Sequence, residues 1–301
     1  MELGMVGLGR MGGNMTRRLL EGGHRVVVFA PSQEAVQTAT RFGAVAASSL
    51  ADMTTKLSPP RAVWVMVPSG KPTEDTVNQL GELLSADDVV IDGGNSNYKD
   101  SMRRAHTLSE RGLHYLDAGT SGGVWGLTEG YCLMVGGGEE AFRRLEPLFQ
   151  TLAPAANPGY AYVGPSGAGH FAKMVHNGIE YGLMQAYAEG FELLQAKKEF
   201  AFDLSTVAEL WRHGSVIRSW LLDLTVAALD KDATLQSVQP YVEDSGEGRW
   251  CAHEAIDLAV SAPVITQSLQ TRFMSRDEQH FGNRLLAALR NEFGGHSIKR
   301  T

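Results

Sequence analysis

The stretch LGMVGLGRMGGN, residues 3–14, decides the fold of the first half of this chain. A short apolar run opens it, and Gly7, Gly9 and Gly12 follow with the spacing G-x-G-x-x-G before an amphipathic segment begins. Glycine allows a tight turn and a close approach of the backbone to a ligand, and the helix N-terminus that comes next can hold a pyrophosphate. The stretch therefore predicts a strand, a turn and a helix that together bind a dinucleotide.

The rest of the first half repeats this alternation of strand and helix. Short apolar runs rich in β-branched residues recur at residues 25–30, 62–67, 88–93, 113–118, 131–137 and 160–164. Near-continuous apolar strands separated by helices are typical of a parallel sheet that is covered on both faces. We predict a Rossmann-type, doubly wound α/β domain over residues 1–163, whose last two runs flank a helix at 139–152 and extend the sheet.

The second half has a different pattern. After residue 164 helical periodicity replaces the strand runs, and the sequence has no internal repeat or low-complexity linker. Helices are predicted at residues 167–196, 203–213, 216–230, 248–260, 264–275 and 278–292. We therefore expect an all-helical second domain over residues 164–301.

Size and charge limit the kinds of partner. With 301 residues, of which 43% are hydrophobic, the chain is long enough to build two cores. A formal net charge of −7 argues against nucleic acid or an anionic membrane surface as a partner, because both need a basic footprint. The opening MELGMVGLG lacks a basic segment and a long apolar core, so we expect no signal peptide, no membrane span and a cytoplasmic location.

The two cysteines carry no sign of a metal site or a disulfide framework. Cys132 and Cys251 lie beside apolar or aromatic neighbours and form neither a CxxC pair nor a metal-ligand spacing. We expect both to be buried free thiols, and we expect no bound metal.

The stretch GAGHFAKMVHNGIEYG, residues 167–182, carries the most chemistry. At about 100° per residue a helix places its polar side chains within an arc of about 140°; they are Lys173, His176, Asn177, Glu180 and Tyr181. Such a stripe is often only a solvated surface, but here it contains mediocre helix formers where a solvent face favours Glu, Lys, Gln and Ala. Lys173 and Glu180 stand roughly 10 Å apart along the axis, too far for an intrahelical ion pair but suited to flanking a small molecule.

The expected dinucleotide contacts come from the carboxyl ends of the predicted strands, where ligands bind in open α/β sheets. They are Gly7, Leu8, Gly9, Arg10, Met11, Gly12, Ala30, Pro31, Ser32, Val67, Pro68 and Asn95. Asn95 belongs to the stretch IDGGNS at 91–96, whose polar residues either form a turn or contact both ligands.

The loop Ala30-Pro31-Ser32 bears on the choice of cofactor. An Asp or Glu normally ends the second strand and binds the adenosine ribose, and this chain has none there. The loop also lacks an arginine for a 2′-phosphate, although Arg10 in the glycine turn is a candidate for that role, for the pyrophosphate or for solvent exposure. We predict NAD as the cofactor, with NADP as the alternative.

These motifs together make the sequence similar to the decarboxylating 6-phosphogluconate dehydrogenases, specifically to their short-chain bacterial subfamily within the β-hydroxyacid dehydrogenase superfamily. The shared motifs are GLGRMGGN at 7–14, MVP at 66–68, IDGGNS at 91–96, TSGG at 120–123, the helix at 167–182, DSGEGRW at 244–250 and FGGH at 293–296. The resemblance implies oxidative decarboxylation of 6-phosphogluconate to ribulose 5-phosphate and CO2, a step of the pentose phosphate pathway and of gluconate metabolism.

The resemblance also implies roles for the helix residues. Lys173 matches the general base that takes the C3 hydroxyl proton while a hydride leaves for the nicotinamide, and Glu180 matches the acid that then protonates C1. Asn177 belongs to the same catalytic group. A lysine acts as a base near neutral pH only where burial or a neighbouring cation lowers its pKa, so a closed, partly apolar cleft is implied.

Substrate contacts and a dimer are implied in the same way. The carboxylate and hydroxyls of the sugar acid would be held by Asn95, Ser121, Gly122, Gly123, His176 and Asn177. The phosphate would be bound by Tyr181 and Arg272, and by Arg290 and His296 from the tail of the neighbouring subunit. The resemblance thus implies a homodimer or higher assembly.

The chain departs from long members of the family at two places. Ser245 and Glu247 stand where those members present a lysine and a threonine to the phosphate, so a carboxylate that pointed inward would repel a dianion. Val124-Trp125 follows the SGG loop where long members carry an acidic residue. The chain is also shorter, which is consistent with the loss of one block of helices.

Two other functions remain open at this point. One is a β-hydroxyacid dehydrogenase that oxidises a small, unphosphorylated 3-hydroxy acid without decarboxylation; the cluster of Arg272, Arg290 and His296 argues for a phosphorylated substrate instead. The other is a catalytically silent dinucleotide sensor, which would have no chemical need for Lys173 and Glu180 together.

Overall fold

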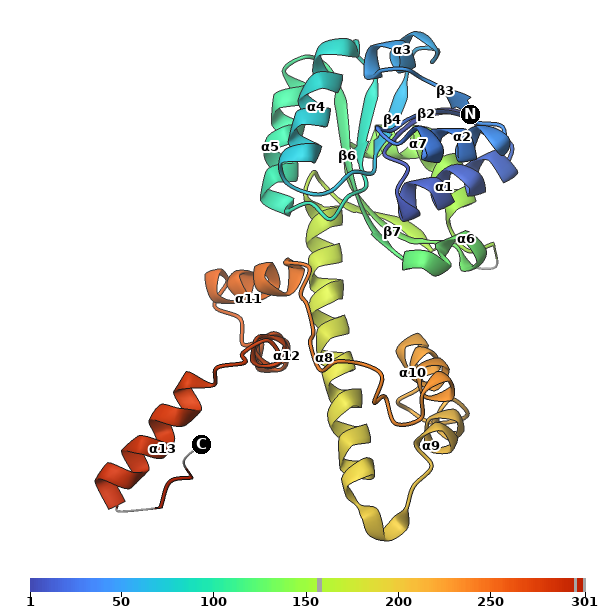
Figure 1. Cartoon of the computed structure of the whole chain (residues 1–301). Helices are drawn as coiled ribbons and strands as arrows, with labels where there is room; N and C mark the ends of the chain where they lie inside the picture. The colour runs from blue at the N-terminus through green and yellow to red at the C-terminus, as the bar shows by residue number, and fades with distance from the viewer. Residues whose placement is uncertain (156–158, 295–296, 300–301) are drawn as a thin grey trace. The chain divides into compact units, whose positions relative to one another are not determined.

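The computed structural model describes residues 1–155, 159–294 and 297–299 (Figure 1). The chain divides into two compact units, residues 1–176 and 177–301, and the division falls within the long helix α8 (Ala168–Ala196). A domain boundary near residue 163 stays a prediction. Each unit is described below by itself.

The first unit is built on one sheet that, within the described residues, has eight strands in the order β3-β2-β1-β4-β5-β6-β7-β8. The strands are β1 (Glu2–Val6), β2 (Arg25–Phe29), β3 (Val45–Ala46), β4 (Ala62–Val65), β5 (Val89–Asp92), β6 (His114–Ser121), β7 (Cys132–Gly137) and β8 (Tyr160–Gly164). Neighbouring strands are parallel except β6 and β7, which are antiparallel. This confirms the doubly wound α/β class, with β7 and β8 extending the sheet as predicted.

Helices cover both faces of this sheet (Figure 1). They are α1 (Arg10–Glu21), α2 (Gln33–Arg41), α3 (Leu50–Thr55), α4 (Lys71–Leu83), α5 (Tyr98–Ser109) and α7 (Glu139–Leu152), while the short α6 (Gly126–Glu129) packs against α1. Successive side chains of a strand point to opposite faces, so β4 sends Trp64 into one core and Val63 into the other.

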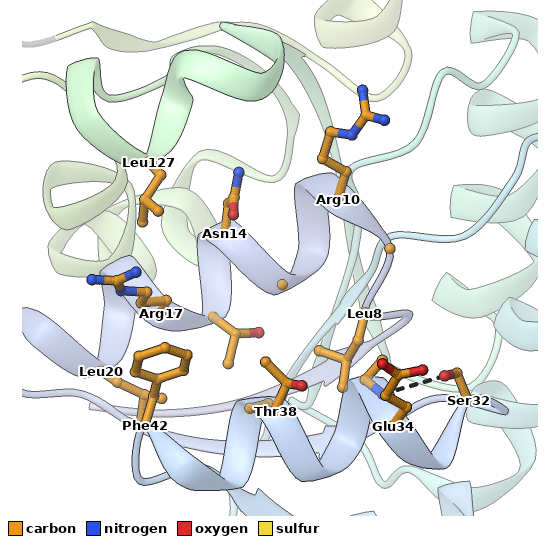
Figure 2. A pocket seen from close by; sticks show the side chains of 15 residues that line it. Leu8, Arg10, Asn14, Arg17, Leu20, Ser32, Glu34, Thr38, Phe42 and Leu127 are labelled. Atoms are coloured by element: carbon orange, nitrogen blue, oxygen red, sulfur yellow. Dashed lines mark hydrogen bonds between the residues drawn. The ribbon is translucent and has the colours of Figure 1, made fainter.

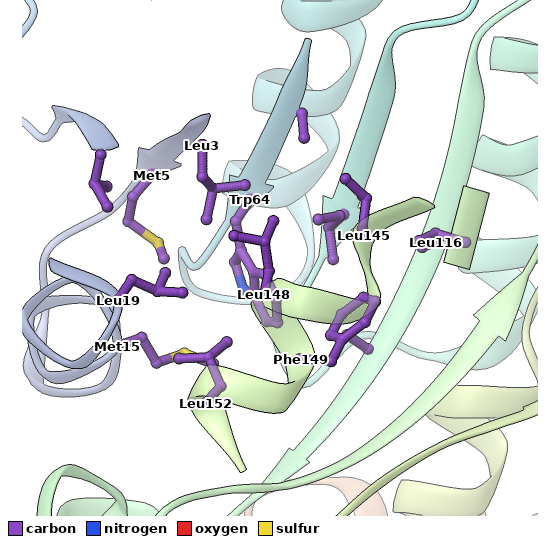
Figure 3. Packing of buried hydrophobic residues seen from close by; sticks show 14 of the residues in the cluster. Leu3, Met5, Met15, Leu19, Trp64, Leu116, Leu145, Leu148, Phe149 and Leu152 are labelled. Atoms are coloured by element: carbon purple, nitrogen blue, oxygen red, sulfur yellow. The ribbon is translucent and has the colours of Figure 1, made fainter. Parts of the chain in front are cut away.

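The larger core lies between the sheet and helices α1 and α7. Figure 3 shows Leu145, Leu148 and Phe149 of α7 packed near Trp64, whose ring centroid lies 6.0 Å from that of Phe149. All four side chains are at most 3% exposed, and burying one such side chain contributes about 1.5–3 kcal/mol. The sheet that positions the site is therefore firmly packed.

The second unit is helical, as predicted. Besides the second half of α8 it contains α9 (Leu204–Trp211), α10 (Trp220–Lys231), α11 (Glu247–Asp257), α12 (Pro263–Met274) and α13 (Phe281–Gly294). Asp203 and Ser219 cap α9 and α10 by accepting hydrogen bonds from backbone N–H groups of the first turn. Among the described helices, none is long and apolar enough to cross a bilayer.

The two cysteines differ from the prediction in one respect. Both are free, and Cys251 is buried as expected, but Cys132 is exposed. Cys132 is the first residue of β7, and strand alternation turns the next side chain, Leu133, into the core while leaving the thiol outside. The expectation of two buried thiols was therefore wrong for Cys132.

Candidate functional site

Two positions in the glycine turn between β1 and α1, Gly7 and Gly12, leave no room for a side chain. A Cβ atom on Gly7 would lie 2.3 Å from the carbonyl oxygen of Met66, and one on Gly12 would lie 2.0 Å from that of Gly7. Gly9, in contrast, faces open space and is the N-cap of α1. The first backbone N–H groups of α1 therefore face a space that suits a pyrophosphate.

A cavity of about 400 Å³ opens beside this turn, between α1 and α2 (Figure 2). Its lining comes from the glycine turn, α1, α2 with its two flanking residues, and α6, and includes Leu8, Gly9, Arg10, Asn14, Arg17, Ser32, Glu34, Thr38, Phe42 and Leu127. Ser32 accepts a hydrogen bond from the N–H of Ala35 and so caps α2. The predicted contacts Leu8, Gly9, Arg10 and Ser32 thus line one cavity.

Glu34 is a lining residue that the sequence did not single out. It lies in the first turn of α2, two residues after Ser32, and its exposed side chain is drawn beside Leu8 in Figure 2. The N-cap serine was the available signal, because it places Glu34 in a helical turn directly after the second strand. A carboxylate here disfavours a second phosphate nearby.

The loops that follow β1, β4 and β5 lie at one edge of the sheet, because these three strands are parallel neighbours. The strand order reverses between β1 and β4, which is where ligands bind in open α/β sheets. The loop after β4 holds partly buried Val67 and exposed Pro68, and the loop after β5 holds exposed Asn95. The predicted cofactor contacts of these loops therefore share the edge with the glycine turn.

Asp92, at the end of β5, fixes the loop that carries Asn95. Its fully buried carboxylate accepts hydrogen bonds from the N–H of Gly94 (3.1 Å), the hydroxyls of Ser96 (2.7 Å) and Tyr115 (2.8 Å), and the guanidinium of Arg104 (3.1 Å). Burial and the Asp92 charge raise the pKa of Tyr115 well above its ordinary value. Asp92 is thus a structural residue that shapes the turn next to the candidate ligand contact.

The N-terminus of α8 is held by a carboxylate from the sheet. Asp117 of β6 is fully buried and accepts hydrogen bonds from the backbone N–H groups of Gly167 (2.7 Å) and His170 (2.9 Å). Burial raises the pKa of Asp117. A negative charge at a helix N-terminus satisfies backbone donors and complements the helix dipole, so Asp117 fixes where α8 begins.

Lys173 lies directly against β6. A Cβ atom on Gly119 would come within 2.5 Å of the Cβ of Lys173 and within 2.6 Å of the carbonyl oxygen of Gly169. Lys173 and Asn177, one turn further along α8, are each only 8% exposed. The backbone of Lys173, the predicted general base, therefore packs closely against β6. The residue as a whole is largely shielded from solvent.

The loop after β6 meets the same helix. The hydroxyl of Ser121 lies 3.3 Å from Nε2 of His176. Gly122 and Gly123 have φ angles of 131° and 52°, which residues with a side chain rarely adopt, and a Cβ on Gly123 would meet nothing within 4 Å. Val124 and Trp125, which depart from the family pattern, are about half exposed.

In the second unit, Arg272 and Tyr181, the two residues predicted to bind a phosphate, lie against each other. The guanidinium carbon of Arg272 lies 3.5 Å from the centroid of the Tyr181 ring, and the arginine also donates to the carbonyl of Glu243 (2.8 Å). Tyr181 is 5% exposed, and its hydroxyl lies 3.2 Å from that of Ser245. The guanidinium of Arg272 thus lies over the face of the Tyr181 ring, while the phenol oxygen of Tyr181 contacts Ser245.

The loop before α11 is tied to this pair. Asp244 accepts hydrogen bonds from Arg249 (2.9 Å) and Arg276 (2.9 Å), and those from Arg249 contribute most to lowering its pKa from 3.8 to about 2. Glu247 is 2% exposed and accepts a hydrogen bond from Ser245 (2.5 Å). The carboxylate of Glu247 therefore points inward, a question that the sequence had left open.

The tail residues are not brought to either cluster within the described part of the chain. Arg290 lies on α13 and is exposed, and His296 falls outside the described residues. Glu180 on α8 is partly buried. The roles proposed for these residues remain predictions.

The first unit has the features of a dinucleotide-binding dehydrogenase, with a phosphate-binding glycine turn at the switch point of a doubly wound sheet, and α8 adds a buried amine at that unit's edge. Profiles of the NAD binding domain and of the C-terminal domain of 6-phosphogluconate dehydrogenase match residues 2–164 and 169–284. The chain belongs to the 6-phosphogluconate dehydrogenase family.

Curated relatives agree with this assignment. The chain is 46% identical over 301 residues to the NAD(+)-dependent, decarboxylating 6-phosphogluconate dehydrogenase of Haloferax volcanii, covering 100% of this chain and 99% of the relative. It is 34% identical to the NAD(+)-dependent, decarboxylating enzyme of Bacillus subtilis, covering 91% of this chain and 61% of that longer protein. The family therefore includes members of this length and longer ones.

Solved structures show the same architecture. Plasmodium falciparum 6-phosphogluconate dehydrogenase, determined also with NADP+ and with 6-phosphogluconate, aligns with a TM-score of 0.85 at 26% identity, over 100% of this chain and 66% of that one. Mycobacterium tuberculosis 3-hydroxyisobutyrate dehydrogenase aligns with a TM-score of 0.74 at 21% identity, over 92% and 94%. The second likeness shows the shared fold.

Proposed function

We propose that this protein catalyses the NAD-dependent oxidative decarboxylation of 6-phosphogluconate to ribulose 5-phosphate and CO2, a step of the pentose phosphate pathway and of gluconate metabolism. The observation that carries the proposal is the buried Lys173, which is packed against β6 on the helix that also bears Asn177 and Glu180. The family and its relatives support the same reaction.

The proton steps fall to two residues of α8. Lys173 takes the proton of the C3 hydroxyl, and NAD, when bound, supplies the hydride acceptor for this oxidation. The carboxylate is then β to a carbonyl and leaves as CO2, while protonated Lys173 polarises the C3 oxygen. Glu180 gives a proton to C1 of the resulting enediol. A positioned acid or base contributes about 10²–10⁴-fold to such a step.

The remaining polar residues hold the substrate. Asn95, Ser121, His176 and Asn177, with backbone groups of Gly122 and Gly123, orient the carboxylate and hydroxyls. Tyr181 and Arg272 bind the phosphate, supported by their close approach.

The glycine turn supports a dinucleotide as cofactor. A Cβ added at Gly7 or Gly12 would collide with neighbouring backbone atoms, so glycine is needed at both positions. The pyrophosphate would lie against the open side of Gly9. Arg10, Met11, Ala30, Pro31, Ser32, Val67 and Pro68 complete the proposed contacts. Glu34 in the adjoining cavity supports NAD over NADP, because its charge opposes a 2′-phosphate.

The assembly is proposed to be a cytoplasmic homodimer or a higher homo-oligomer. Its support is α13, where Phe281, Leu285, Leu286 and Leu289 are 47–70% exposed and form an apolar surface that a second copy would cover. In such an assembly Arg290 and His296 would complete the phosphate site of the neighbour.

The purified protein tests the function directly. It should reduce NAD in the presence of 6-phosphogluconate and release CO2, with faster turnover of phosphorylated than of unphosphorylated gluconate. Silence with both NAD and NADP would refute the proposal, and equal turnover of the two gluconates would assign the protein to the unphosphorylated 3-hydroxy acids instead.

A further inference from the structure

Glu247 is a buried acidic residue that has no role in the proposed reaction. It begins α11, is 2% exposed, and accepts a hydrogen bond through Oε2 from the hydroxyl of Ser245 at 2.5 Å. Its other oxygen, Oε1, has no hydrogen-bond partner among the described residues. A buried polar atom without a hydrogen-bond partner destabilises the fold, so packing interactions must compensate for placing this carboxyl group here.

The hydrogen bonds around Ser245 run in one direction. Its backbone N–H donates to the Tyr181 oxygen (3.1 Å), and its hydroxyl donates to Glu247. Ser245 has a single hydroxyl proton; with Glu247 ionised, that proton is used in the bond to the carboxylate, so Tyr181 is the donor in the 3.2 Å contact between the two hydroxyls. The chain therefore runs from Tyr181 through Ser245 to the carboxylate, and the phenol has no proton left for a phosphate oxygen.

We propose that binding of the substrate phosphate at Tyr181 is coupled to the uptake of one proton by Glu247, an inference that rests on the proposed function. The proton comes from solvent and joins the Glu247 carboxylate, which then donates to the Ser245 hydroxyl. Ser245 turns its own proton to the Tyr181 oxygen, and Tyr181 turns its proton to the phosphate. Only hydroxyl groups rotate, and the protein gains one proton and loses one negative charge.

The other charged groups around the chain suit this change. Arg272 from α12 lies over the ring of Tyr181 from α8, while Asp244 in the loop is paired with Arg249 of α11 and with Arg276. Once Glu247 is neutral, the charge of Arg272 faces the phosphate without an opposing carboxylate on the Ser245 side. Glu247 is thus a positioning residue that acts on the substrate through two hydroxyls.

Calorimetry on the full-length protein tests the coupling. Binding of 6-phosphogluconate is measured at one slightly alkaline pH in two buffers with different ionisation enthalpies, which gives the number of protons taken up per site. The wild type should take up about one proton more than Glu247→Gln, whose amide donates to Ser245 without needing a proton. Unphosphorylated gluconate, which has no phosphate to accept the Tyr181 proton, should show no difference between the two proteins.

A second variant keeps the test decisive if Glu247→Gln is poorly folded. Ser245→Ala leaves the acid in place but breaks the chain, so it should take up as few protons as Glu247→Gln. Equal proton uptake by wild type and either folded variant would overturn the coupling. Failure of the wild type to turn over 6-phosphogluconate would instead refute the proposed function, so the two failures are distinguishable.

Discussion

Gly119→Ala is the sharpest test of how α8 is positioned. Gly119 lies in β6, opposite Met134 of β7, in an extended conformation that alanine also adopts. The added methyl group would lie 2.5 Å from the Cβ of Lys173 and 2.6 Å from the carbonyl oxygen of Gly169. Carbon atoms in contact prefer about 3.5–4.0 Å, so α8 would have to move away from the sheet by about 1 Å.

Both stability and turnover should respond. Overpacking of this kind costs about 1–3 kcal/mol, and each kcal/mol lowers the melting temperature by about 2–4 °C in a domain of about 150–250 residues. A shift of about 1 Å in a catalytic group reduces turnover about 100-fold. Thermal unfolding and steady-state kinetics with 6-phosphogluconate measure the two effects.

The matched control is Gly190→Ala on the same helix. A Cβ there meets nothing within 4 Å, and alanine is favoured over glycine in a helix by about 0.5–1 kcal/mol. This variant should keep its activity and melt at the same or a higher temperature. If Gly119→Ala behaved like Gly190→Ala in both assays, the tight packing of Lys173 on β6 would be wrong.

Three further changes give separate readouts. Lys173→Met should lower turnover roughly 100-fold or more, because a general base is lost, while substrate binding by calorimetry changes little; activity within tenfold of wild type would remove Lys173 from that role. Asp244→Asn should lower the melting temperature at neutral pH. Because the folded pKa of Asp244 is depressed to about 2, its contribution is present above the ordinary value of 3.8 and is lost as pH falls toward about 2, so a wild-type advantage that persisted unchanged at pH 2 would contradict the ion pairs. Glu34→Gln should tighten NADP binding relative to NAD about fivefold, the effect of roughly 1 kcal/mol between two charges about 4 Å apart in water; an unchanged ratio of dissociation constants would exclude Glu34 from cofactor choice.

Much of the fold follows from local sequence patterns. Alternating apolar runs predicted the sheet, and the helix over residues 139–152 has the predicted bounds. β3 escaped prediction because it is only Val45–Ala46, too short for a pattern. β6 runs on to Ser121, beyond its apolar run, because its second half pairs with β7, a partner that local sequence does not reveal.

The candidate site, like the fold, was predicted from the sequence only in part. Helical spacing predicted the polar face of α8, and the family resemblance supplied roles for its residues. Asp117 was missed because its partners lie 50 and 53 residues away, and a buried aspartate looks like any other in a strand. The inward direction of Glu247 depends on Ser245 and on Tyr181, 64 residues before that serine. Contacts of this range are set by packing rather than by local pattern.

The contrast between the two cysteines gives the chain a natural handle for spectroscopy. Cys132 is exposed at the start of β7, in register with Ser121 of β6, whereas Cys251 is buried. A maleimide dye would therefore attach at a single position in the native protein, one strand away from a proposed ligand contact. Such a label would report ligand-induced changes at the end of β6 by fluorescence without any engineered residue.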